Sequence, residues 1–489
     1  MRFAVSWSTS TAALAVALLI TPALAAAQAI TPAEQARIDD IVTSAIAKAG
    51  VPSASIAVVR GDKLVLAKAY GKASETIPRA TPALPYQIAS ISKQFTAAAI
   101  LLLQRDGKLS LDDTVSKFIP GVSGGDRITL RQLLSHTAGL QDYWPQDYSF
   151  PAMRTPTTPQ AIVDRWGKKP LDFTPGTQWQ YSNTGYVVAG LIVEKVAGEP
   201  LLAFLQRRVF HPLGMTATDQ DLAVGPRYPQ GYQRFALGPV RVERTPARGW
   251  LFAAGELSMT PSDLARWDIA RIDRALLAPA DWQAQEMPVK LTDGTSNGYG
   301  LGVQSGTRGG HRFVEHSGEA VGFLSENIVF PDDKTAVIVF VNSDFSNAYT
   351  AIAEDVSRVV LGNPPVAAHA TETAGEPPAA APAPLEPERT AAARRVFEAL
   401  RAGALDRSVM TADSSYYFTP VALGDYRASL TPLGEPTSFV LTRAARLRGG
   451  FVNRNYRVTY PNGRKLSVVT YAEPGDKGRY EQFLVMPAE

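Results

Sequence analysis

Ser90-Ile-Ser-Lys93 stands directly before an apolar segment, residues 94–104, whose pattern predicts a helix that ends near Gly107. Residues three positions apart share one helix face, so we expect Ser90 and Lys93 side by side. A serine hydroxyl is a weak nucleophile until a neighbouring base takes its proton, and a lysine amine kept neutral by burial near a helix N-terminus can do so. The spacing indicates a nucleophile and its base, but a surface lysine one turn after an N-cap serine has the same pattern.

A second candidate is Tyr181-Ser-Asn183, in a turn-rich stretch before the apolar helix predicted over residues 187–196. A phenol can relay a proton. A nearby carboxamide can orient a lysine and a substrate carbonyl. Taken alone, the triplet is also compatible with an ordinary turn.

The third candidate, His316-Ser317-Gly318, lies on a predicted strand just before Val321-Gly-Phe323. An edge strand of this kind can pair with the backbone of a substrate. Its backbone N–H groups, together with that of Ser90, could form an oxyanion hole. A single histidine is equally compatible with a structural role.

Two other stretches, residues 121–125 and 294–298, match the G-x-S-x-G pattern of a nucleophile elbow. That motif needs a strand before it and a helix directly after it. Neither stretch has this context, so both are predicted to be loops.

The order S-x-x-K, Y-x-N, H-x-G resembles the serine β-lactamase and penicillin-binding protein superfamily, and specifically its class C branch, which has Tyr in the second motif. Coverage is roughly residues 33–362. Further stretches with this likeness are 133–140, 211–215, 253–255, 260–267 and 299–302.

The resemblance implies an α/β (α+β) fold in which helices flank an antiparallel sheet, with an all-helical subdomain beside it. It implies an acyl-enzyme on Ser90, with Lys93 and Tyr181 sharing the acid–base work in an order left open. Asn183 would orient Lys93 and the substrate, and the backbone N–H groups of Ser90 and Glu319 would form the oxyanion hole. No cofactor is implied.

Two departures from the class C pattern bear on the reaction. His316 stands where class C β-lactamases have Lys, and an imidazole is mostly neutral near pH 7. Glu319 stands where a small residue is usual, and its carboxylate could repel carboxylate substrates or attract an ammonium group. H-x-G is similar to the third motif of D-aminopeptidases and esterases of this branch.

We therefore expect cleavage of small-molecule or peptide esters or amides, including D-amino-acid peptides, with residues 316–319 contacting the substrate. The alternatives are a class C β-lactamase, a D-alanyl-D-alanine carboxypeptidase, or a catalytically weak module that binds cell wall or protein. The aromatic loops 141–159 and 226–250 would wall the cleft. His136 is interpreted as a structural residue.

The chain divides into a hydrolase domain over residues 30–362, a Pro/Ala-rich linker over 363–388 and a small α+β domain over 389–489. The last is interpreted as an accessory module or a site of homo-oligomerisation. Elements expected in the hydrolase domain are helices over 32–49 and 348–361 and strands over 53–60, 63–70, 327–330 and 335–342. Elements expected in the last domain are a helix over 390–401 and strands over 439–446, 451–460 and 465–471.

Residues 1–27 have the charged start, apolar core and small-residue cleavage site of a signal peptide, so we expect a periplasmic or secreted protein without a stable membrane anchor. The net charge of +3 disfavours a nucleic-acid partner. Cysteine is absent, which excludes disulfides, thiolate metal sites and a cysteine nucleophile. The five histidines lack metal-ligand spacing, so no metal site is expected.

Overall fold

The computed structural model of the chain describes residues 29–362 and 386–488. The predicted signal peptide lies outside these ranges, as does most of the predicted linker. None of the helices in the described ranges is long and apolar enough to cross a membrane.

A six-stranded antiparallel sheet forms the centre of the first domain, with the strand order β2-β1-β11-β10-β9-β8. Its middle strands come from both ends of the domain, because β1 pairs with β11. The mixed fold class is confirmed and the four expected strands are present, but their direct pairing as β1 with β11 in the middle of the sheet was not predicted. The strands are β1 (Ser53–Arg60), β2 (Lys63–Gly71), β8 (Gln304–Arg308), β9 (His311–Ala320), β10 (Phe323–Phe330) and β11 (Thr335–Val341).

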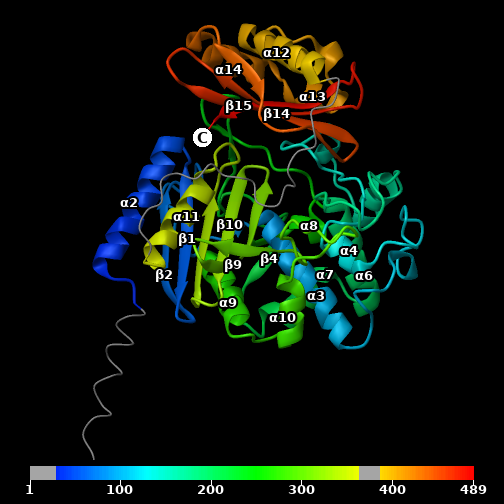
Figure 1. Cartoon of the computed structure of the whole chain (residues 1–489). Coiled ribbons are helices and arrows are strands. Elements are labelled where there is room, and N and C mark those ends of the chain that lie inside the picture. The colour runs from blue at the N-terminus through cyan, green and yellow to red at the C-terminus, as the bar shows by residue number, and fades with distance from the viewer. Residues whose placement is uncertain (1–28, 363–385, 489) are drawn as a thin grey trace, which may run out of the picture.

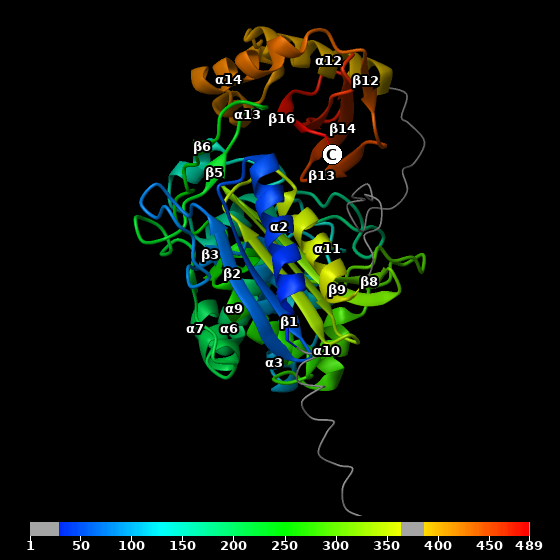
Figure 2. The same cartoon turned by 90° about the vertical axis from the view of Figure 1, so that its left-hand side faces the viewer.

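Two helices cover one face of this sheet: α2 (Pro32–Ala49), which starts with a capping box at Thr31, and α11 (Ala348–Val360) (Figures 1 and 2). The other face packs against a mostly helical half of the domain. The helices there are α3 (Lys93–Arg105), α4 (Leu130–Leu134), α5 (Pro159–Ile162), α6 (Asn183–Ala197), α7 (Leu201–Leu205), α8 (Phe252–Gly255), α9 (Pro261–Ile272) and α10 (Pro279–Glu286). Short strands complete it: β3 (Tyr86–Gln87), β4 (Ala217–Asp219), β5 (Tyr232–Gln233), β6 (Arg241–Val242) and β7 (Leu257–Met259).

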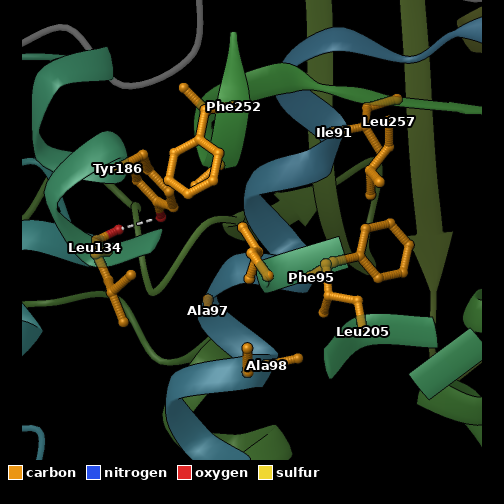
Figure 3. Packing of buried hydrophobic residues seen from close by; sticks show 14 of the residues in the cluster. Ile91, Phe95, Ala97, Ala98, Leu134, Tyr186, Leu205, Phe252 and Leu257 are labelled. Atoms are coloured by element: carbon orange, nitrogen blue, oxygen red, sulfur yellow. Dashed lines mark hydrogen bonds between the residues drawn. The ribbon is translucent and has the colours of Figure 1, made fainter. Parts of the chain in front are cut away.

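Helix α3 runs through the centre of the larger hydrophobic core, where its side chains from Lys93 to Leu103 are all buried. Phe95 and Ala97 pack there among side chains from several other elements (Figure 3). A nucleophile at the start of this helix is therefore attached to one of the most rigid parts of the molecule. The two G-x-S-x-G stretches lie in loops, as expected.

The second domain packs three helices, α12 (Glu386–Ala402), α13 (Ala412–Tyr417) and α14 (Pro420–Leu430), on a five-stranded antiparallel sheet. Its strands are β12 (Ser438–Leu441), β13 (Arg446–Arg448), β14 (Phe451–Thr459), β15 (Lys465–Ala472) and β16 (Tyr480–Pro487). The strand expected over 439–446 is wrong: β12 ends at Leu441, and both short strands pair with different parts of β14. Strand β16 was not predicted.

Helix α12 begins at Glu386, three residues inside the predicted linker. The Glu386 carboxylate accepts two hydrogen bonds from the Arg454 guanidinium, at 2.9 and 3.0 Å, and both side chains are buried. A buried two-point ion pair of this kind fixes the start of the helix to the sheet, which the Pro/Ala composition did not reveal.

The second domain sits over one end of the first, against the loops predicted to wall the cleft (Figures 1 and 2). Arg241 forms two hydrogen bonds to Asp425, at 2.6 and 2.8 Å, and Asp147 exchanges hydrogen bonds with Gln482. Phe235 of the first domain belongs to the hydrophobic core of the second. These loops thus hold the second domain against the first.

Candidate active site

Ser90 lies in η1, a short 3₁₀ helix (Ala89–Ser92) that continues directly into α3. The residue before it, Ala89, has a φ of 48°, a left-handed conformation that costs free energy for any residue with a Cβ atom. This sharp turn leaves Ser90 partly exposed while its neighbours are buried. The hydroxyl is therefore accessible on a rigid support.

Lys93 is completely buried one turn after Ser90. Its Nζ lies 2.9 Å from Ser90 Oγ and donates to Asn183 Oδ1 at 2.9 Å and to the Ala254 carbonyl oxygen at 2.6 Å, so both N–H groups of the neutral amine have acceptors and its lone pair is left for the Ser90 hydroxyl. Burial lowers the pKa of Lys93 well below its usual value, since a cation is poorly solvated there. An amine in this state can accept the proton of a serine hydroxyl.

Tyr181 donates a hydrogen bond to Ser90 Oγ at 2.8 Å. Burial raises the pKa of its phenol, so this group holds its proton near neutral pH. The ring lies against that of His136, with 4.2 Å between centroids, and His136 Nδ1 accepts the backbone N–H of Ser182 at 3.1 Å. His136 is buried, as expected, but it also holds Tyr181 in place, a contact that the sequence did not reveal.

Asn183 is the first residue of α6, whose N-cap Ser182 accepts the backbone N–H of Gly185. The Asn183 carboxamide accepts from Lys93 and donates to Asp142 Oδ2 at 3.4 Å, while its backbone N–H donates to Asp142 Oδ1 at 3.1 Å. Asp142 is buried and was not predicted, since one aspartate in a loop has no recognisable pattern.

His316 lies on β9, beyond the part of this strand (residues 311–315) that pairs with β8. Its Nε2 lies 2.8 Å from the Tyr299 hydroxyl, and its Nδ1 lies next to the Ser317 carbonyl oxygen. Burial lowers the pKa of His316 to about 3, so the ring is neutral at physiological pH. This position therefore presents no cation to a substrate.

Gly318 allows β9 to lie directly against the turn that carries Ser90. A Cβ atom at this position would lie 2.2 Å from the Ile88 carbonyl oxygen and 2.3 Å from Ser325 Oγ, closer than any side chain tolerates. The contact brings the backbone of Glu319 next to the Ser90 turn, where the oxyanion hole is predicted.

The side chains of Ser317 and Glu319 are exposed. The Glu319 side chain contacts solvent, but protein atoms surround its carboxyl group and reduce its hydration. This desolvation, together with the negative charge of the nearby Asp147, raises the pKa of Glu319 to about 8. The positive charge of Arg448, in the second domain, lowers this pKa by a smaller amount. An unprotonated carboxylate at Glu319 thus becomes the main form only above about pH 8.

The described residues contain no group of three or more His, Asp or Glu side chains placed to hold a metal ion. A cavity of about 120 Å³ lies between the two domains, and Asp142, Tyr143, Gly449 and Phe451 are among the residues that line it. None of the three motifs lines this cavity, so it is separate from the Ser90 site.

Comparison with known proteins agrees with the family resemblance of the three motifs. The family model described as Beta-lactamase matches residues 38–361. Penicillin-binding protein 4* of Bacillus subtilis (strain 168) is 31% identical over 314 residues, which are 60% of this chain and 69% of that protein.

Two solved structures are also similar. A D-stereospecific amidohydrolase from Streptomyces sp. is 28% identical with a TM-score of 0.58, covering 65% of this chain and 97% of its own. An octameric penicillin-binding protein homologue from Pyrococcus abyssi is 21% identical with a TM-score of 0.60, and covers 92% of this chain and 99% of its own. With the family match and the three motifs together, the chain belongs to the beta-lactamase family and is a serine hydrolase of the β-lactamase and penicillin-binding protein superfamily.

Proposed function

We propose that the protein is an exported hydrolase that forms an acyl-enzyme on Ser90 and cleaves esters or amides, including D-amino-acid amides and peptides. The observation that carries this proposal is the contact of Lys93 Nζ with Ser90 Oγ at 2.9 Å, made by an amine whose burial favours its neutral form. A neutral amine at hydrogen-bond distance is what a general base for serine requires.

In the acylation step Lys93 takes the proton of Ser90 while Oγ attacks the substrate carbonyl carbon. The negative charge that develops on the carbonyl oxygen is stabilised by the backbone N–H groups of Ser90 and Glu319. Tyr181, which keeps its proton, donates it to the leaving nitrogen or oxygen and receives the proton held by Lys93. This assigns the base role to Lys93 and the acid role to Tyr181.

In the second step water attacks the acyl-enzyme carbonyl and loses its proton to the same pair of side chains. The C–Oγ bond breaks, and Ser90 recovers its proton. Asn183 holds Lys93 in place through both steps.

The substrate class is inferred from the third motif. A neutral His316 removes the cation that binds the carboxylate of a β-lactam in class C enzymes, while Glu319 offers a carboxyl group to a substrate ammonium. The amidohydrolase from Streptomyces is named as D-stereospecific, which supports a D-configured amide among the substrates.

A second candidate function is acylation by penicillins. The relative named penicillin-binding protein 4* favours it. We also propose export, supported by the signal-peptide pattern of residues 1–27, and oligomerisation, supported by the octameric homologue.

The test is a matched panel of initial rates for the mature protein and its Ser90→Ala variant. The panel holds a p-nitrophenyl ester, D- and L-alanine p-nitroanilides with free or acetylated amines, and a chromogenic cephalosporin. We expect Ser90-dependent turnover of the ester or a D-anilide and slow cephalosporin turnover. Rapid acylation of Ser90 by the cephalosporin, seen as a burst of one product per enzyme or as turnover, would select the second candidate, and turnover that survives in Ser90→Ala would refute the mechanism.

A further inference from the structure

The second domain reaches the active site through one tight hairpin. Strands β13 and β14 are joined by Gly449 and Gly450, whose φ values of 60° and 82° are both left-handed, as a two-residue hairpin turn requires. A Cβ atom on Gly449 would lie 2.8 Å from the Asp142 carbonyl oxygen, and one on Gly450 would lie 3.2 Å from Gln141 Oε1. The turn is thus pressed against the loop that carries Asp142.

Arg448 is the residue just before this turn. Its Nη2 and Nε donate to Asp142 Oδ2 at 2.9 and 3.3 Å, and its Nη1 donates to the Tyr471 hydroxyl at 3.2 Å. The guanidinium lies 5.5 Å from the centre of the Tyr181 ring. The second domain therefore places a fixed cation beside the residues that activate Ser90.

The contacts continue from Arg448 to the nucleophile without a gap. Asp142 accepts from both the carboxamide and the backbone N–H of Asn183, and the Asn183 carboxamide oxygen accepts from Lys93. We infer that Arg448 is a positioning residue for Lys93: it balances the charge of Asp142 and, through Asp142, holds the Asn183 carboxamide against the amine. This inference deepens the proposed function and rests on it.

A role in domain docking alone accounts less well for this geometry. Arg241 and Asp425 already form a two-point ion pair across the same interface, with no contact to the three motifs. The Asp142 side chain is fully buried, so its negative charge needs a cation nearby. Lys93 cannot be that cation, because a general base must be neutral, and Arg448 supplies the positive charge instead.

The charges that face Lys93 give the sign of the effect. Asp142 raises the pKa of Lys93, and Arg448 lowers it. The other titratable groups around the amine are His136 and His316, both with lowered pKa values, and the rings of Tyr181 and Tyr186. Without Arg448 the unbalanced Asp142 would favour the lysine cation, and deprotonation of Lys93 would require a higher pH.

The experiment uses the full-length mature protein and an alkyl fluorophosphonate as probe. Ser90 Oγ bonds to phosphorus, fluoride leaves, and the serine proton passes to Lys93. Because fluoride needs no proton to leave, the labelling rate depends on the base and not on the general acid. The rate constant is measured by intact mass from pH 5 to 10. Its rise with pH gives the apparent pKa of the base.

For Arg448→Gln we expect this apparent pKa to rise by about one unit, which is the smaller end of the shift that a nearby unbalanced charge causes. For Asp142→Asn we expect a fall of similar size. The double variant should return close to the wild-type value, because both charges are then gone. Arg448→Lys keeps the charge and should keep the wild-type apparent pKa.

Arg241→Gln is the matched control, since it removes an arginine of the same interface that pairs with Asp425 and does not act on Lys93. The apparent pKa of the base should stay unchanged in this variant. An unchanged profile in Arg448→Gln, or an equal change in Arg241→Gln, would overturn the inference. If Arg448→Gln fails to fold, the inference is tested by Asp142→Asn alone. An unchanged or raised apparent pKa of the base in that variant would overturn the inference. Labelling of Ser90→Ala would instead overturn the proposed function, so the two failures are distinguishable.

Discussion

The two sides of the Ser90 site are built in different ways. On one side, Ser90, Lys93, Tyr181 and Asn183 come from helix starts inside one domain, and each belongs to a short motif of fixed spacing. On the other side, Arg448 comes from a separate domain and reaches the site through a hairpin turn. The first side holds the groups proposed to do the chemistry, and the second side is proposed to adjust the position and the pKa of Lys93.

This difference shows how an accessory domain can affect a reaction without contacting the substrate. Arg448 hydrogen bonds to Asp142, and two further hydrogen bonds lead from there to the Lys93 amine. Changes on the first side should therefore abolish the reaction, and changes on the second side should shift its rate and pH dependence.

The largest effect should follow from Lys93→Met. Removing the base should lower kcat/KM for an ester by at least about a thousandfold, because general acid–base catalysis contributes on the order of 10²–10⁴. The melting temperature should stay equal or rise, since an apolar side chain replaces a buried amine. Rates and thermal melts are the measurements, and a loss below tenfold would contradict the base role.

The next effect concerns the turn of the second domain. Gly449→Ala adds a Cβ atom against the Asp142 backbone at a left-handed position, and we expect kcat/KM to fall by about tenfold as Arg448 withdraws. Gly463→Ala is the control, because Gly463 has a φ of 79° in the β14–β15 turn and has no heavy atom within 4 Å of its Cβ position. Both variants should lose stability by about 1 kcal/mol or more. If kcat/KM falls equally in both, the coupling between the domains is absent.

A smaller effect should follow from Glu319→Gln. At pH 8, where about half of the carboxyl groups are charged, losing this group should lower the preference for a free-amine D-anilide over its acetylated form by about two- to fivefold, a typical effect of an exposed charge pair. Ser317→Ala, which removes the neighbouring exposed side chain without changing charge, should affect both substrates equally. An unchanged preference in Glu319→Gln would mean that the carboxyl group does not contact the amine.

The pH dependence of this preference provides a further prediction. The pKa of Glu319 is raised to about 8, so the carboxylate that attracts a cation forms as the pH rises through that value. For a trimethylammonium substrate, whose charge does not titrate, the ratio of its kcat/KM to that of its neutral analogue should rise between pH 7 and 9. A preference that is flat or falls with pH would contradict this assignment.

Much of the fold could be predicted from the sequence because its signals are local. The capping box at Thr31, the helix after Lys93 and the hairpins of the sheet each depend on neighbouring residues, and each is present in the structure. In the second domain the residues between β12 and β13 are irregular, which an apolar pattern over 439–446 could not show.

The predicted site residues could be found for the same reason, since each motif is short and lies at a helix start or on a strand, while their meeting in space was implied only by the family resemblance. Asp142 and Arg448 could not be predicted, because their importance arises from a contact between residues 306 positions apart. The neutral state of His316 was expected from its ordinary pKa, but burial is the stronger cause and lowers that pKa to about 3.

The most direct test of the whole account is to trap the acyl-enzyme. The mature protein is mixed with a p-nitrophenyl ester, quenched in acid during turnover and digested, and the peptide that carries the acyl group is identified by mass spectrometry. The account predicts an acyl group on Ser90 in the wild type and none in Ser90→Ala. An acyl group on another residue, or full turnover by Ser90→Ala, would contradict it.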